Sequence, residues 1–180
     1  MRGYFSTLVA ALVYVPMLVE ARRASRNERA QRARGGIEPP GDVYRLMRLV
    51  YPGAFLLMLA EGAIRGGPPP WLFAVGAATF AVAKTVKWWA IVSLGPAWTF
   101  RVIVVPGAPR VVRGPYRWIR HPNYVGVVGE LAGAAAMAGA PIAGVAGLVA
   151  FAGLLVRRIA VEDAALRQLR QAASERPATS

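Results

Sequence analysis

The 180-residue chain contains no cysteine, a single histidine and only nine acidic residues. Without cysteine it has no disulfide framework, no thiolate metal site and no cysteine nucleophile. One histidine and few carboxylates also supply few ligands for a catalytic metal, and we expect none. The motifs of common soluble enzymes are missing too, among them the P-loop, HExxH, the nucleophile elbow and the glycine-rich dinucleotide fingerprint. Any cofactor must therefore be held by helix ends and loops.

Apolar residues and arginine are what the chain has in excess. Hydrophobic residues make up 56% of it, and its net charge is +13. This composition is too apolar for an ordinary soluble domain of this size and predicts an integral membrane protein. A large positive charge can indicate nucleic acid binding. Here, however, the arginines lie between apolar runs, as they do in membrane proteins. We therefore expect contacts with membrane lipids and none with nucleic acid.

Five apolar runs predict an all-α bundle of about five transmembrane helices. They cover about residues 4–19, 46–64, 71–94, 124–138 and 142–159. Only three residues separate the last two runs, so these are expected to form a helical hairpin. A cleaved signal peptide is the alternative for the first run, but Glu20-Ala21-Arg22-Arg23 follows it instead of a small-residue cleavage site. We assign residues 1–171 to one membrane domain and expect the polar tail, 172–180, to be disordered.

The arginines divide unevenly between the two sides of such a bundle. On one side the connectors hold only Arg65. The other side carries Arg22, Arg23, Arg26, Arg29, Arg32, Arg34, Arg45, Arg48, Arg101, Arg110, Arg113, Arg117, Arg120, Arg157, Arg158, Arg167, Arg170 and Arg176. Because cytoplasmic loops are enriched in arginine and lysine, we predict that the N-terminus lies outside and the C-terminus in the cytoplasm.

A polar segment, residues 114–124, stands at the start of the fourth run and holds the only histidine. Pro122 suits the first position of a helix and biases His121 away from helical geometry. The backbone N–H groups of Asn123, Tyr124 and Val125 are then expected to be free and to favour an anion. Arg117 and Arg120 add positive charge. The segment therefore predicts a site for an anionic group at the cytoplasmic face.

Two further sets of charged residues are candidates for the same site. Arg158 and Glu162 are four residues apart at the end of the fifth run, so they share a helix face and can pair or bracket a ligand. Snorkelling at the membrane edge is the alternative for Arg158. Glu130 lies deep in the fourth run, where a carboxylate needs a cavity or a partner, and Lys84 is a candidate partner. It is either a site residue or half of a buried ion pair.

The order of several short motifs resembles a known enzyme family. These motifs are Trp89-Ala90-Ile91, Leu94-Gly95, Trp98-Thr99, Gly114-Pro115-Tyr116-Arg117, Arg120-His121-Pro122-Asn123-Tyr124, and Arg158 followed by Glu162-Asp163. Over about residues 86–166 the chain resembles the isoprenylcysteine carboxyl methyltransferase family. The likeness is strongest to short bacterial members found beside type III polyketide synthases, which O-methylate long-chain alkylpyrones or related phenolic lipids.

The resemblance implies a membrane enzyme that binds S-adenosylmethionine at the cytoplasmic end of its last two helices. The cofactor contacts expected here are Tyr116, Arg117, Arg120, His121, Pro122, Asn123, Tyr124, Arg158, Glu162 and Asp163, and the candidate catalytic residues are His121, Glu130 and Arg158. The family's second glutamate is Asp163 here. Residues 166–180 lack the aromatic residues typical of members that act on prenylated proteins.

The sequence leaves alternatives for the methyl acceptor and for the class of reaction. We expect a lipophilic acceptor, with a polyketide-derived lipid oxygen preferred over a carboxyl group or an amine. A phenol or enol benefits from a base, for which His121 and Glu130 are the candidates. One alternative is an NADPH-dependent sterol or steroid reductase, because such enzymes can carry a similar RHPNY element. The other is a membrane scaffold whose arginines bind anionic lipid.

Overall fold

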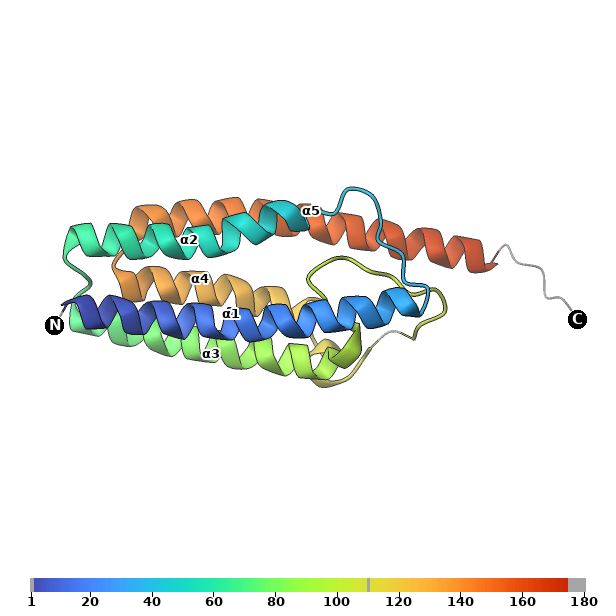
Figure 1. Ribbon diagram of the computed structural model, residues 1–180, viewed down its shortest axis with the longest axis horizontal. Coiled ribbons are helices and arrows are strands. Elements are labelled where there is room, and N and C mark those ends of the chain that lie inside the picture. Colours follow the sequence, from blue (N-terminus) through green and yellow to red (C-terminus); the bar gives the residue numbers. More distant parts are fainter. Residues whose placement is uncertain (1, 110, 175–180) are drawn as a thin grey trace, which may run out of the picture.

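Five long helices make up nearly the whole of the protein. The computed structural model describes the backbone of residues 2–109 and 111–174 and the side chains of residues 10–109 and 111–168. The helices are α1 (Arg2–Ala33), α2 (Tyr44–Arg65), α3 (Pro70–Leu94), α4 (Pro122–Ala138) and α5 (Pro141–Ser174), with the short 3-10 helices η1 (Gly95–Ala97) and η2 (Gly114–Arg117) between α3 and α4. They run along one long axis (Figure 1). The predicted all-α bundle of five helices is confirmed.

Several of these helices are long enough to cross a membrane. Three segments, Tyr44–Arg65, Pro70–Ala97 and Pro141–Gln168, have the length and hydropathy of membrane spans. This identifies a multi-pass membrane protein. The 34 residues of α5 correspond to about 51 Å, well beyond the roughly 30 Å of a hydrocarbon core. Its end projects past the other helices (Figure 1). The helix α5 includes residues 172–174, the beginning of the tail that the sequence predicts to be disordered. The rest of that tail, residues 175–180, lies outside the described part of the structure.

The predicted hairpin between α4 and α5 forms, and its turn has the residues typical of helix ends. Gly139 ends α4 in the left-handed conformation, with φ 66°, which glycine adopts without steric cost. Pro141 then begins α5, where its missing N–H is not needed. Glu61 of α2 accepts hydrogen bonds from Ala143 N at 2.6 Å and Ile142 N at 3.3 Å. Because these N–H groups have no partner within the helix, Glu61 caps α5 and fastens α2 to it.

The helices α3 and α4 approach each other most closely, and glycine makes this possible. Gly126, Gly129 and Gly133 lie along one face of α4, and that face meets α3. A Cβ atom on Gly133 would lie 2.6 Å from Phe80 N, and one on Gly129 would lie 2.7 Å from Ala83 Cβ. The pair Gly129 and Gly133 therefore acts as the small-residue contact that its spacing suggests.

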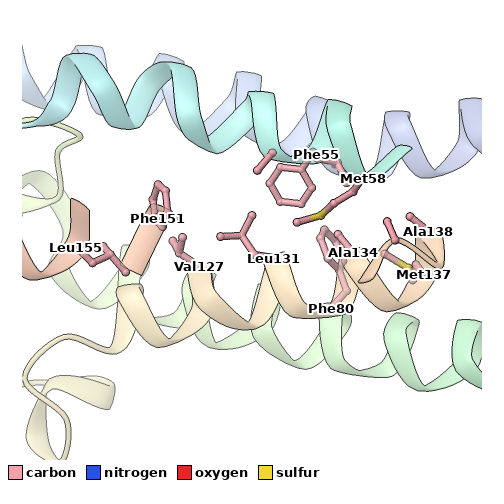
Figure 2. Packing of buried hydrophobic residues seen from close by; sticks show 13 residues of the cluster. Phe55, Met58, Phe80, Val127, Leu131, Ala134, Met137, Ala138, Phe151 and Leu155 are labelled. Atoms are coloured by element: carbon pink, nitrogen blue, oxygen red, sulfur yellow. The ribbon is translucent and has the colours of Figure 1, made fainter. Parts of the chain in front are cut away.

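The apolar core fills the space between α2, α4 and α5, with a contribution from α3. Phe55 and Met58 of α2 face Leu131 of α4, while Phe151 of α5 and Phe80 of α3 close the cluster on either side (Figure 2). Phe55, Met58 and Leu131 are each at most 1% exposed. Since neighbouring helices bury these side chains together, the core fixes how α4 is rotated, and with it the direction of the polar side chains on α4.

We predict that Gly133→Ala destabilises the bundle. The added Cβ meets backbone, which cannot rotate away, so α3 and α4 must separate; overpacking of this kind costs roughly 1–3 kcal/mol. Thermal unfolding in detergent measures the effect as a lower Tm. Gly153→Ala is the matched control, because Gly153 is a helical glycine of α5 with open space around its Cα. Equal Tm values for the two variants would contradict the tight contact.

Candidate functional site

The polar segment before α4 folds largely as its sequence indicates. Pro122 is the first residue of α4, and His121 precedes it with the non-helical angles φ −130° and ψ 60°. One expectation is wrong: the N–H groups of Tyr124 and Val125 are not free, because both donate to His121 O, at 3.1 and 3.4 Å. The carbonyl of a capping residue accepts the first bonds of its helix. The N–H groups of Tyr124 and Val125 are therefore not available to an anion, and the surrounding side chains are its main candidate partners.

Tyr124, Arg158 and Glu162 meet at the start of α4. Arg158 Nε of α5 donates to the Tyr124 hydroxyl at 2.9 Å, and that hydroxyl lies 3.4 Å from Glu162 Oε2. Arg158 and Glu162 thus bracket one oxygen rather than pairing with each other. Arg158 is only 6% exposed, so snorkelling to the membrane edge does not describe it. The His121 ring stacks on Tyr124, with centroids 5.2 Å apart and planes 7° from parallel.

A carboxylate from the linker between α1 and α2 joins this cluster. Asp42 Oδ1 lies 3.2 Å from Arg158 Nη1 and also accepts the Tyr44 N–H at 3.0 Å, while Oδ2 accepts the Val102 N–H at 2.9 Å. The Asp42 side chain is 4% exposed. Sequence reasoning missed it. Its only signal is an acidic residue, preceded by glycine, at the end of an arginine-rich connector.

The turn η2 carries two more of the predicted site residues and is seated against α3. Gly114, with φ 59°, allows this, because a Cβ there would lie 2.0 Å from Ser93 Oγ. Burial raises the pKa of Tyr116 above its ordinary value of 10, and neighbouring Tyr124 and Glu162 add to the effect. Tyr116 therefore stays a neutral donor at physiological pH. Arg117 extends over the ring of Trp118, 5.8 Å from its centroid.

The remaining predicted pair lies at the surface. Arg120 Nη2 is 3.6 Å from Asp163 Oδ1, and the Arg120 side chain is 72% exposed. Such a pair contributes little stability in water. The ion pair does connect the segment before α4 to α5, directly beside Glu162. Positively charged arginines and negatively charged carboxylates therefore alternate around the start of α4.

Glu130 belongs to a separate cluster deeper in the bundle, six residues or about 9 Å further along α4 than Tyr124. With Glu20, Lys84 and Lys87 it forms a closed ring of alternating charge. Lys84 Nζ lies 2.8 Å from Glu130 Oε1 and 3.5 Å from Glu20 Oε1. Lys87 Nζ lies 3.1 Å from Glu130 Oε2 and 2.6 Å from Glu20 Oε2. The predicted partnership of Glu130 with Lys84 is confirmed.

The ring engages both oxygens of Glu130. Tyr51 of α2 donates a further hydrogen bond to Oε2. Glu130 and Glu20 are at most 1% exposed, and two ammonium groups balance the two carboxylates. Lys84, Lys87 and Tyr51 already occupy the oxygens of Glu130, so the geometry favours its ion-pair interpretation and leaves His121 as the candidate base. No local pattern in the sequence points to Glu20 or Tyr51, because they contact residues that lie 64 or more positions further along the chain.

Two polar groups near the start of α4 have unused bonding capacity. Arg158 uses Nε and Nη1, and Nη2 has no partner among the residues that the structure describes. Asn123 Oδ1 is buried and likewise has no partner within that part of the chain. Buried polar atoms normally have partners. A ligand with both an anionic group and an N–H donor matches this pair. No group of three or more potential metal ligands occurs among the described residues.

Comparison with known proteins decides the family. The profile of the isoprenylcysteine carboxyl methyltransferase (ICMT) family matches residues 75–168, which include most of α3, all of η2 and α4, and most of α5. The chain belongs to the ICMT family. It is also 33% identical over 125 residues to the uncharacterized protein YpbQ of Bacillus subtilis (strain 168), covering 69% of this chain and 74% of YpbQ. No solved structure matches the chain.

Membership of the ICMT family indicates the kind of reaction to consider for this site. Members of this family are methyltransferases that use S-adenosylmethionine as a co-substrate. The family match contains Tyr124, Glu130, Arg158 and Glu162. It does not contain Asp42, Glu20 or Tyr51, which this chain brings to the two clusters from outside the matched segment.

We predict that Glu130→Gln destabilises the protein strongly. It leaves Lys84 and Lys87 with only Glu20 to balance them, and breaking a buried ion pair on one side costs roughly 3–5 kcal/mol. The double variant Glu130→Gln with Lys84→Met restores the charge balance. We expect its Tm in detergent to lie above that of the single variant. A double variant less stable than Glu130→Gln would show that the ring does not act as a closed unit.

Proposed function

We propose that this chain is an integral membrane methyltransferase that uses S-adenosylmethionine and methylates an oxygen of a lipophilic acceptor. The observation that carries the proposal is the buried Arg158. Two of its nitrogens are held by Tyr124 and Asp42, and Nη2 is left without a partner in the described chain. Together with Asn123 and Glu162 it matches the charges of an amino acid group, which S-adenosylmethionine carries.

Each residue at the start of α4 has a role in this proposal. Arg158 Nη2, with help from Arg117 and Arg120, binds the carboxylate of the co-substrate. Glu162 and Asn123 Oδ1 take its amino group, and the stacked rings of His121 and Tyr124 offer faces to its positive charge. The bound co-substrate supplies a methyl group already activated on a sulfonium. The protein therefore has mainly to align the acceptor oxygen with that methyl.

A phenolic or enolic acceptor must also lose a proton. His121 stands at the entrance of α4 and is the group we assign to that task, because Glu130 is occupied by the lysines. The burial that raises the pKa of Tyr116 keeps its hydroxyl protonated, which excludes Tyr116 as the base. An acceptor carboxylate would need no base, and its methylation would not depend on His121.

An apolar groove supports the lipophilic acceptor. It has a volume of about 440 Å³ and lies between α3 and α4, lined by Ala78, Thr79, Val82, Ala83, Val86, Val125, Gly126 and Gly129. Val125 follows Tyr124 in the chain, so one end of the groove reaches the first turn of α4, the turn that carries Tyr124 on its α5 side. A long alkyl chain in this groove would bring its polar head to His121. Such a chain fits the polyketide-derived lipid preferred above, as does the absence of aromatic residues from 166–180.

The same geometry supports the predicted orientation in the membrane. The linker 34–43, the connector from η1 to α4 and the projecting end of α5 all lie at one end of the bundle, and the N-terminus lies at the other (Figure 1). Arginine concentrates at that end. We therefore place it in the cytoplasm, where S-adenosylmethionine is available, and the N-terminus outside.

We predict that the purified protein binds S-adenosylhomocysteine and not NADPH. His121→Ala and Glu162→Ala should each weaken the binding about ten- to hundredfold, because each removes a contact to a charged group. Calorimetry in detergent measures both ligands on the same sample. Glu28→Ala is the control, since Glu28 pairs with Arg101 at 3.7 Å and has no contact with Tyr124. Binding of NADPH alone would favour the reductase, and binding of neither ligand would favour the scaffold.

We predict that Val82→Trp lowers the rate of methylation of a long-chain alkylphenol about tenfold. The added ring fills the groove, so the effect should vanish for a short-chain alkylphenol, and the affinity for S-adenosylhomocysteine should not change. Val75→Trp is the matched control, because Val75 is an exposed valine of α3 that does not line the groove. An equal loss for both chain lengths, or for both variants, would contradict the assignment of the groove.

A further inference from the structure

Among the residues that the structure describes, Asp42 is the one carboxylate that contacts the candidate site from outside the segment matched by the family profile. That profile covers residues 75–168, whereas Asp42 lies in the linker between α1 and α2. Its side chain is 4% exposed, and that of Arg158, at 3.2 Å, is 7% exposed. Burying a carboxylate and a guanidinium together needs good geometry and further hydrogen bonds. The contacts around Asp42 provide both.

The two oxygens of Asp42 contact three different parts of the chain, namely the start of α2, the connector after α3, and Arg158 of α5. Tyr44 N fixes Oδ1 from the start of α2, and Val102 N fixes Oδ2 from the connector after α3. Gly41 precedes it with φ 87°, a left-handed angle that lets the linker turn there. Because backbone groups fix the carboxylate, it is a rigid anchor for a mobile side chain such as that of arginine.

A clasp of two segments holds this anchor in place. We use the name clasp for the linker residues 34–43 and the connector residues 98–109. Ile37 and Val104 exchange two backbone hydrogen bonds of 2.9 Å. Glu38 pairs with Arg101 at 2.7 Å and also with Arg32. Burial alone would raise the pKa of Glu38, but the bonds from Arg101 and Arg32 outweigh it and lower the pKa. Glu38 therefore stays ionised at neutral pH and keeps its ion pairs with Arg101 and Arg32.

Two fixed nitrogens determine the position of the third. The guanidinium is planar and rigid, so holding Nε on the Tyr124 hydroxyl and Nη1 on Asp42 fixes where Nη2 points. Nη2 is the nitrogen without a partner in the described chain. Without the Asp42 charge, Arg158 would keep one contact and could rotate about it towards Glu162.

We propose that Asp42 is a positioning residue that orients Arg158 to bind the carboxylate of the co-substrate. The proposal rests on the proposed function, because it takes Arg158 as the carboxylate-binding group. It makes the linker between α1 and α2 a functional part of the enzyme, although Asp42 touches neither co-substrate nor acceptor. It acts only through Arg158.

The test is a double-mutant cycle on the dissociation constant of S-adenosylhomocysteine, measured with the full-length protein in detergent. Its members are the unmodified protein, Asp42→Asn, Arg158→Gln and the double variant. Asn keeps the shape and an acceptor oxygen for the backbone N–H groups but loses the charge. We expect Asp42→Asn to raise Kd about tenfold or more, and to change Kd less than twofold when Arg158→Gln is already present. Glu38→Gln is the control for the linker: it weakens one ion pair of the clasp but keeps the Asp42 charge and the two Ile37–Val104 backbone bonds, so it should raise Kd less than twofold.

Each outcome has one meaning. If Arg158→Gln weakens binding but Asp42→Asn does not, the positioning role is wrong and the proposed function stands. Equal effects of Asp42→Asn with and without Arg158, or an equal effect of Glu38→Gln, would reduce Asp42 to a support of the fold. If Arg158→Gln leaves Kd unchanged, the proposed site itself is wrong. Should Asp42→Asn fail to fold, as judged by its Tm, Asp42→Ser keeps one acceptor oxygen and takes its place in the cycle.

Discussion

The close approach of α3 and α4 is the constraint on which the rest of the protein depends. Three glycines on α4 let its backbone meet α3, and the core residue Leu131 fixes its rotation. Glu130 is then directed at Lys84 and Lys87, and the charge ring ties α1 and α2 to the same pair of helices. With α4 held in this way, its first turn has a fixed position beside α5, and there the Tyr124 hydroxyl accepts a hydrogen bond from Arg158.

The two polar clusters of the bundle differ in how their charges are balanced. In the ring, each charge has a partner of opposite sign, and even Glu20 Oε1 and Glu130 Oε1, which lack a hydrogen bond, face the Lys84 ammonium group. At the start of α4, by contrast, Arg158 keeps one guanidinium nitrogen, and Asn123 one amide oxygen, without a partner in the described chain. An arginine nitrogen that faces no partner is available to an anionic ligand. This is the physical reason for placing the co-substrate there and not at Glu130.

Much of this arrangement could be predicted from the sequence, because its signals are local. Apolar runs gave the five helices, Pro122 and Gly139 gave the ends of α4, and the spacing of Arg158 and Glu162 placed them on one face. The depth of Glu130 called for a partner, and Lys84 was a correct choice. Glu20, Tyr51 and Asp42 could not be found, since these contacts join residues 64 to 116 positions apart and depend on packing. The free N–H groups were expected wrongly because the His121 carbonyl was overlooked.

The central claim is that Arg158, held by Tyr124 and Asp42, binds the carboxylate of the co-substrate. A crystal structure of the full-length protein with S-adenosylhomocysteine, grown from a lipid phase, tests this most directly. We predict that the ligand's carboxylate lies within hydrogen-bonding distance of Arg158 Nη2, with Asp42 still on Nη1. A ligand bound elsewhere in the bundle, or an Arg158 turned away from the bound ligand, would contradict it.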